Sequence, residues 1–264
     1  VRVIPVYWVY TLLLLSISLL SFVELKTEYT YISLLKSLFF VPHDNPSEQL
    51  GKFPFLTVGW TLNFEMFFYM LLGVMLFIFK RKAEFITCII LFTLPIVWGD
   101  LWLFGYNYIF LSSYLFEFAI GLLIGCAYCH GGYYPKENNI IAIVLFLLAL
   151  TILYINGPQS QKYLSVSLIV AATLCINNAI FDNKFGRFLC LLGSISYSTY
   201  LVHTIILVLL VNGFGDKPSA ITEFIVIPLY IGMVYVCSVL SYKKLEIGSF
   251  NSYIKNYLYK LCKV

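Results

Sequence analysis

The sequence predicts an all-α protein, a polytopic bundle of transmembrane helices, and three observations lead to this fold class. Hydrophobic residues make up 61% of the 264 residues and charged residues only 11%, whereas soluble domains carry about 25% charge. The mean hydropathy is +0.88. Apolar runs of nearly membrane-spanning length recur along the whole chain. The expected partner is therefore the lipid bilayer, and the small, scattered net charge of +4 gives no reason to expect nucleic acid.

Eight apolar runs are long enough, or nearly so, to cross a hydrocarbon core of about 30 Å. They cover residues 5–24, 60–79, 84–98, 109–129, 139–156, 163–180, 190–211 and 221–241. The third run is short, so it would tilt, re-enter the membrane or extend into residues 99–103. Proline and glycine punctuate the connections between the runs. Residues 29–41 form a shorter apolar run, which we interpret as an interfacial or re-entrant segment on the outer side.

The distribution of positive charge predicts the orientation of these spans. If the N-terminal end is cytoplasmic, five basic residues fall outside, which leaves twelve of the 17 Lys and Arg residues inside. The five are Lys26, Lys36, Lys52, Lys162 and Lys217. This asymmetry satisfies the positive-inside rule. It predicts that both ends are cytoplasmic, that residues 80–82 are a topology anchor and that residues 242–264 form a basic cytoplasmic tail.

A carboxylate inside the second apolar run is the main chemical signal. Thr61, Glu65 and Tyr69 are spaced i, i+4 and i+8, so a helix places all three on one face. A charged group at membrane depth costs about 2.5–3.5 kcal/mol on insertion scales, and such groups usually face a bundle interior or a watery cavity. Glu65 is therefore a candidate functional residue, and a structural hydrogen-bond hub between helices is the alternative.

A second polar face lies late in the chain. Ser196, Tyr200 and His203 are spaced i, i+4 and i+7 inside a predicted span, with Thr204 beside them. A neutral imidazole can accept or donate a proton near pH 7, which is what acyl transfer requires close to the acceptor hydroxyl. A buried histidine that is satisfied by a Tyr or Ser partner is the alternative role for His203.

Four segments, in the same order, resemble the integral-membrane acyltransferase-3 family, which includes O-acetyltransferases of surface glycans. Residues 60–69 read Trp-Thr-Leu-x-x-Glu-x-x-x-Tyr and are similar to the Trp-Ser/Thr-Leu-x-x-Glu-x-x-Phe-Tyr signature of that family. Residues 2–8 look like the end of its Arg-x-x-Arg-x-x-Pro-x-Tyr-Trp segment, and residues 116–121 resemble its Phe-x-x-Gly helix. Residues 192–203 are similar to its late Leu-Gly-x-x-Ser-Tyr-x-x-Tyr-Leu-x-His segment. Together the four segments extend over nearly the whole chain.

The resemblance implies a membrane acyltransferase of the bacterial inner membrane. Residues 1–264 would then be one acyltransferase domain that lacks its first two spans, with ten spans in the full protein. Family members carry a His regarded as the catalytic base in the first of those two spans. We expect that His before Val1, and an Arg three residues before Arg2. The implied reaction needs no bound cofactor, because acetyl-CoA or another acyl-CoA is a co-substrate.

Acyl transfer assigns roles to the candidate residues. Arg2, at the mouth of the first span, would bind the phosphates of acyl-CoA. Glu65 and His203 are the candidate catalytic residues, and Trp60, Tyr69, Ser196 and Tyr200 the candidate substrate-binding residues. Trp60 and Glu65 should lie near the outer end of their span, where a glycan or lipid-linked sugar could reach them. Acyl-CoA is in the cytoplasm, whereas a glycan acceptor would be on the outer face of the membrane. Transfer between them requires either a channel through the membrane or an acyl-enzyme relay, and the sequence leaves both open.

Cysteine and histidine patterns suggest no metal site. The seven cysteines fall within spans or on the cytoplasmic side, where thiols stay reduced. Residues 126–130 match the Cys-x-x-Cys-His pattern of haem attachment, but that attachment takes place on the other side of the membrane. No second Cys or His pair completes a zinc site. We expect His43 to be a solvated loop residue and His130 to be a structural helix end.

Two other functional classes remain open from the sequence. A secondary transporter would fit the number of spans, although no internal repeat is visible. A non-catalytic acyltransferase-like subunit is the second alternative. For an enzyme, the first choice of acceptor is a surface polysaccharide such as O antigen, and secondary metabolites or peptidoglycan are further possibilities.

Overall fold

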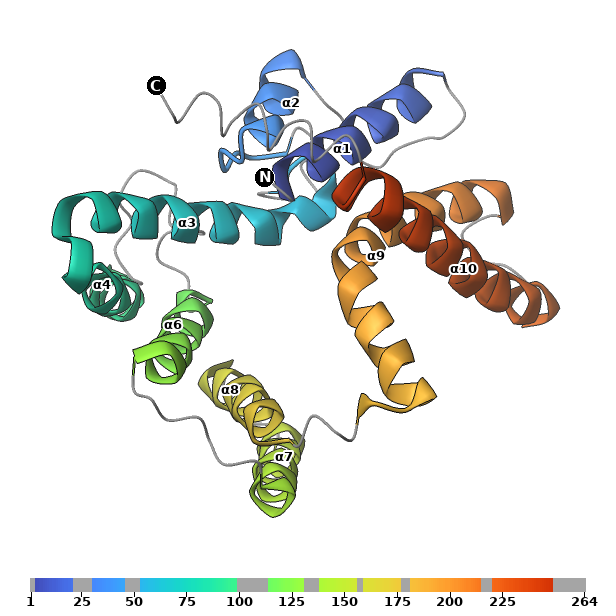
Figure 1. The fold of residues 1–264 in the computed structure, drawn as a ribbon. Coiled ribbons are helices and arrows are strands. Elements are labelled where there is room, and N and C mark those ends of the chain that lie inside the picture. The colour runs from blue at the N-terminus through green and yellow to red at the C-terminus, as the bar shows by residue number, and fades with distance from the viewer. Residues whose placement is uncertain are drawn as a thin grey trace. The chain divides into compact units, whose positions relative to one another are not determined.

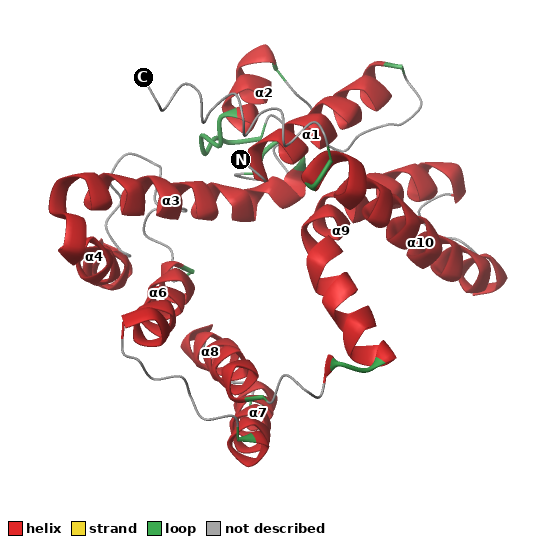
Figure 2. Ribbon diagram, in the orientation of Figure 1, coloured by secondary structure: helices red, strands yellow, loops and turns green. Residues whose placement is uncertain are grey.

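A computed structural model shows the fold, and every described element is helical (Figures 1 and 2). The structure describes residues 3–20, 30–45, 53–98, 114–130, 138–155, 159–176, 181–214 and 220–248. Within these ranges there is no strand, so the all-α prediction is confirmed. The chain divides into two compact units, and each is described by itself. The first contains residues 1–62 and 187–264, and the second contains residues 63–186.

The helices follow the predicted apolar runs closely. They are α1 (Val3–Leu19), α2 (Tyr31–Leu38), α3 (Trp60–Phe79), α4 (Ala83–Trp98), α6 (Leu115–His130), α7 (Asn139–Tyr154), α8 (Gln159–Cys175), α9 (Lys184–Phe214) and α10 (Ala220–Ser241). Two 3₁₀ turns, η1 (Thr57–Gly59) and η2 (Lys80–Lys82), flank α3, and a π-helical turn, η4 (Tyr242–Glu246), follows α10.

Three continuous helical stretches are long and apolar enough to cross a membrane. They are residues 57–97, in which η2 joins α3 to α4, residues 184–214 and residues 222–246. Four shorter apolar helices accompany them in the described part of the chain, within α1, α6, α7 and α8. The protein is therefore a helical membrane protein, and the number of spans stays a prediction.

Helix α9 begins six residues before the predicted span. Asn183 precedes the helix, and its side-chain oxygen accepts a hydrogen bond from the Gly186 amide at 2.7 Å, as an N-capping residue does. Gly186 also lies against the backbone of Phe181, where a Cβ would come within 2.3 Å of the Phe181 carbonyl oxygen. Capping, rather than hydrophobicity, therefore sets the start of α9.

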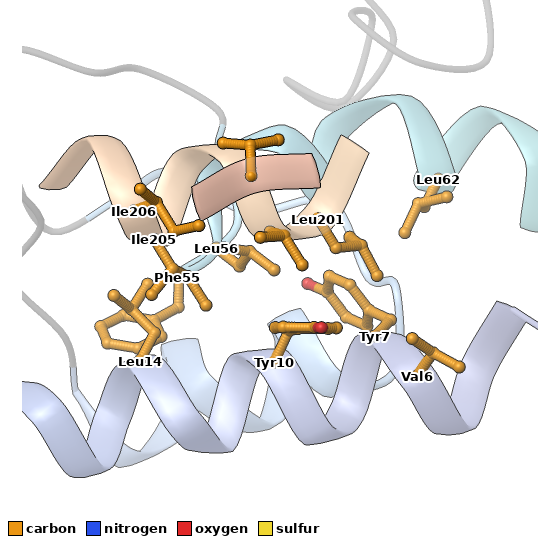
Figure 3. Packing of buried hydrophobic residues seen from close by; sticks show 12 residues of the cluster. Val6, Tyr7, Tyr10, Leu14, Phe55, Leu56, Leu62, Leu201, Ile205 and Ile206 are labelled. Atoms are coloured by element: carbon orange, nitrogen blue, oxygen red, sulfur yellow. The ribbon is translucent and has the colours of Figure 1, made fainter. Parts of the chain in front are cut away.

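The first unit has a hydrophobic core to which several parts of the chain contribute. Tyr7 of α1 points toward Leu56 and Leu201, and Tyr10, Val6 and Leu62 belong to the same buried cluster (Figure 3). Residues 205 and 206 of α9 and Val234 of α10 complete this buried cluster. The core therefore holds α1, the start of α3 and the middle of α9 together.

The connection between α1 and α3 folds back along α1. Tyr7 donates a hydrogen bond from its hydroxyl to the Ser37 carbonyl at 3.3 Å, and Trp8 donates from Nε1 to the Leu38 carbonyl at 2.8 Å. The Phe55 amide donates to Ser37 Oγ at 2.9 Å. These contacts place residues 37 and 38 beside the first half of α1, and the interfacial and re-entrant interpretations of residues 29–41 both stay predictions.

The second unit contains helical pairs. α3 and α4 are joined by η2, where Lys80 adopts a left-handed backbone with φ 46°. α4 packs against α6, and α7 packs against α8. The rings of Phe92 and Phe116 lie 5.7 Å apart between α4 and α6.

Candidate active site

The late motif on α9 is a hub of hydrogen bonds in the first unit. Tyr197 donates from its hydroxyl to the Val3 carbonyl of α1 at 2.9 Å. Ser198, one residue further along, contacts Ser241 Oγ at 3.0 Å and also the carboxylate of Glu246. Neighbouring polar residues of this motif thus form hydrogen bonds to different elements, Tyr197 to α1 and Ser198 to α10 and η4. These bonds explain why an otherwise apolar helix carries hydroxyl groups here.

Tyr200 reaches the start of α3. Its hydroxyl donates to the Val58 carbonyl at 2.5 Å, and Thr61 Oγ1 lies 2.7 Å from the same phenol oxygen. Since a phenol carries only one proton, the Thr61 hydroxyl is the donor to Tyr200. The sequence predicted Tyr200 as a substrate ligand, and the structure places its hydroxyl between two groups of the protein itself.

His203 is half-buried and lies one turn beyond Tyr200. The two ring centroids are 5.9 Å apart. His203 Nδ1 lies 3.2 Å from the Thr199 carbonyl oxygen. A carbonyl can only accept, so Nδ1 carries the proton and Nε2 of a neutral imidazole keeps its lone pair. The geometry therefore assigns Nε2 as the atom of His203 that can take a proton.

Trp60 is half-buried and is the first residue of α3. Its ring meets that of Phe53 edge-on, with centroids 6.3 Å apart. Gly59, immediately before it, packs on the ring of Tyr7. Tyr7 lies twelve residues before Leu19, or about 18 Å along α1 at 1.5 Å per residue. Trp60 is therefore the first residue of its helix, as predicted. It lies beside the first half of α1, about 18 Å along that helix from Leu19, because the segment before Trp60 folds back along α1.

Ser196 is exposed on α9, whereas Tyr200 and His203 on the same face are partly covered. Glu65 and Tyr69 lie on α3 within the second unit. Glu65 is half-buried, and Tyr69 is 52% exposed. Arg2 lies outside the described residues, so its predicted role in binding acyl-CoA remains a prediction. The structure thus brings Trp60, Tyr200 and His203 into one unit and describes Glu65 and Tyr69 in the other.

A buried carboxylate escaped the sequence analysis. Glu246 is 3% exposed and accepts a hydrogen bond from Ser198. From the sequence alone, Glu246 falls within the predicted basic tail because it follows Lys243 and Lys244. The signal that could have found it is an acidic residue one turn after an apolar helix, five residues beyond the last serine of that helix. The remainder of that tail, residues 249–264, lies outside the described residues.

The prediction for His43 was wrong. This histidine is buried, with Nδ1 2.9 Å from the Val41 carbonyl oxygen and Nε2 3.4 Å from Ser37 Oγ. The cause is the return of residues 30–45 along α1, which covers side chains that an ordinary loop would expose. His130 belongs to α6 as its last residue, as expected.

Two features define the class of protein. Its apolar helices are long enough to cross a membrane, and polar side chains form hydrogen bonds within the first unit, so it is an integral-membrane protein with polar groups between its helices. The sequence matches the acyltransferase domain family over residues 1–243. This chain therefore belongs to the acyltransferase-3 family, as its motifs predicted.

Among curated proteins, the chain is similar to the exopolysaccharide production protein ExoZ of Rhizobium meliloti (strain 1021). The two are 29% identical over 209 residues, which is 77% of this chain. The match spans 64% of the length of that relative. No solved structure matches the chain.

Proposed function

We propose that this chain carries the core of a membrane acyltransferase that moves an acyl group, with acetyl as the first choice, from acyl-CoA to a hydroxyl of a surface polysaccharide such as O antigen. Membership of the acyltransferase-3 family supports the reaction class. The similarity to a protein named for exopolysaccharide production supports a polysaccharide as the acceptor. The bacterial inner membrane is the location that suits a cytoplasmic donor and a glycan acceptor.

The observation that carries the proposal is the 3.2 Å distance between His203 Nδ1 and the Thr199 carbonyl oxygen, which leaves Nε2 free of that contact. In the proposed reaction, Nε2 of His203, and not the His expected before Val1, takes the proton of the sugar hydroxyl as its oxygen attacks the thioester carbonyl. The new C–O bond forms, the C–S bond breaks, and the departing CoA thiolate takes up a proton. The hydrogen bond from Nδ1 to Thr199 holds the ring in the form that can act as this base.

Trp60 and Glu65 are proposed as acceptor contacts. An indole face is a platform on which a sugar ring can stack, and a carboxylate can accept hydrogen bonds from sugar hydroxyls. Tyr69 and Ser196 are proposed as further polar contacts to the acceptor. Arg2 is proposed to bind the phosphates of acyl-CoA. Both a direct transfer and an acyl-enzyme relay are compatible with these roles.

A transfer assay tests the proposal. Full-length protein in inner-membrane vesicles, supplied with acetyl-CoA labelled in the acetyl group, should transfer label to surface polysaccharide or its lipid-linked precursor. Vesicles from cells without the protein are the control. Label that stays in CoA although the protein is present would contradict an acyltransferase, and proton-coupled uptake of a solute by the same vesicles would favour the transporter alternative.

A further inference from the structure

A candidate substrate contact, Trp60, and a candidate catalytic residue, His203, lie on either side of one short hydrogen-bonded connection. Trp60 begins α3, and His203 lies on α9. Between them, the Tyr200 hydroxyl bonds the Val58 carbonyl at 2.5 Å and the Thr61 hydroxyl at 2.7 Å. Thr61 Oγ1 also lies 3.3 Å from the Val58 carbonyl oxygen. The three oxygen atoms form a small ring of contacts, in which the two hydroxyl protons supply two hydrogen bonds, from Tyr200 to Val58 and from Thr61 to Tyr200.

The ring brackets Trp60 in the sequence. Val58 and Thr61 stand on either side of Gly59 and Trp60, so a phenol that holds both of them fixes the backbone of the two residues between. Gly59 is held from the other side by Tyr7, which is fully buried. Few backbone rotations remain for Trp60 under these contacts.

The same tyrosine is fixed relative to His203. Tyr200 and His203 are three positions apart on α9, which places them as neighbours on one helical face. Their ring centroids are 5.9 Å apart. Leu201 and Val202, between them, are buried in the core, which prevents this part of α9 from turning. Tyr200 is therefore fixed twice. Val58 and Thr61 hold its hydroxyl, and the packing of α9 holds its backbone.

We infer that Tyr200 and Thr61 form a positioning clamp that sets the acceptor platform of Trp60 at a fixed place relative to His203, and that Tyr200 does not itself hold the sugar. The inference rests on the proposed function. Its chemical basis is that the single phenol proton of Tyr200 is already donated to Val58, so it is not available to a sugar hydroxyl. Misplacement of reacting groups by about 1 Å can cost roughly a hundredfold in rate, so such a clamp has a kinetic consequence.

Four variants of the full-length enzyme test the clamp. Tyr200→Phe removes the hydroxyl, Thr61→Val removes its donor, and the double variant removes both. Tyr197→Phe is the matched control, because this tyrosine also donates to a backbone carbonyl from α9 but reaches Val3 and not the start of α3. The readouts are kcat and KM for both substrates, and the midpoint of thermal unfolding in detergent.

The clamp predicts that Tyr200→Phe and Thr61→Val each lower kcat/KM for the acceptor by about tenfold or more. The KM for acyl-CoA should stay unchanged. The double variant should be no worse than the worse single variant, because both changes open the same ring. Tyr197→Phe should lower the unfolding midpoint without this kinetic change. Wild-type kinetics in Thr61→Val with a loss in Tyr200→Phe would overturn the inference in favour of direct substrate binding, and additive losses would also overturn it.

A second readout separates the clamp from the proposed function. In a background in which every tryptophan other than Trp60 is replaced by Phe, Trp8, Trp98 and Trp102 among them, the emission of Trp60 reports its surroundings. Both clamp variants should shift this emission, and Tyr197→Phe should not. An enzyme without any transfer activity would refute the proposed function, while this shift would still support the clamp. Unchanged emission in both clamp variants would overturn the clamp even in an active enzyme.

Discussion

Gly59 lies directly against the phenol ring of Tyr7, so that a Cβ at position 59 would meet Tyr7 Cε2 at 2.7 Å and its hydroxyl oxygen at 2.8 Å. Tyr7 cannot withdraw easily, because it is buried in the core and its hydroxyl bonds the Ser37 carbonyl. This contact holds the start of α3 against α1.

Gly59→Ala should therefore destabilise the protein. Overpacking a close contact typically costs about 1–3 kcal/mol, so the variant should unfold at a lower temperature than the wild type. Thermal unfolding in detergent measures the effect. Gly232→Ala is the control, since a Cβ there has no neighbour within 4 Å. Equal unfolding midpoints for the two variants would show that Gly59 and Tyr7 are not in contact.

The buried carboxylate on η4 leads to a second prediction. Glu246→Ala should cost about 1–3 kcal/mol of stability, because it deprives the buried Ser198 hydroxyl of a strong acceptor and leaves a cavity. Glu246→Gln should cost less, since its amide oxygen can still accept from Ser198. The midpoint of chemical or thermal unfolding distinguishes the two variants. A neutral effect of Glu246→Ala would contradict a stabilising role of this contact.

The helix bounds show what the sequence could predict and what it could not. The span 60–79 matches α3 residue for residue, because apolar content alone defines that helix. The start of α9 was missed, because the Asn183 cap acts through hydrogen bonding and leaves no trace in hydropathy. Periodicity and composition thus predict that the helices exist and roughly where they lie. The residue at which a helix begins depends on hydrogen bonds made by individual polar side chains, such as the cap at Asn183.

The candidate site was only partly predictable. The face of Tyr200 and His203 follows from helical spacing, and the structure confirms that the two rings are neighbours. The contact of Tyr200 with Thr61 joins residues 139 positions apart, which no local pattern reveals. His43 was misjudged for the same reason, because its burial depends on the fold of a whole connecting segment.

Topology gives a third prediction. In a background without native cysteines, Asp44→Cys and Phe214→Cys should react with a membrane-impermeant reagent from the outside, and Arg81→Cys from the cytoplasmic side. All three side chains are exposed in the structure. The expectation follows from the charge asymmetry of the loops. Labelling of Asp44→Cys and Phe214→Cys from the cytoplasmic side alone would reverse the orientation.

Glu65 allows a fourth prediction, which separates function from structure. Glu65→Gln is nearly isosteric and removes a charge at membrane depth, so the membrane level of the protein should be preserved. If Glu65 contacts the acceptor, acetyl transfer per molecule should fall by at least about tenfold. Quantitative immunoblotting alongside the transfer assay measures both. Activity that falls only in step with protein level would mark Glu65 as a structural residue.

The most direct test of the account is acetyl transfer by the full-length His203→Gln variant, measured per molecule in membrane vesicles. Glutamine occupies a similar volume and can still donate to the Thr199 carbonyl, but it cannot take up a proton. Loss of a general base typically costs about a hundredfold to ten-thousandfold in rate, and we predict a loss in that range at an unchanged membrane level. Wild-type transfer per molecule by His203→Gln would contradict the account, because it would remove His203 from the chemistry of the reaction.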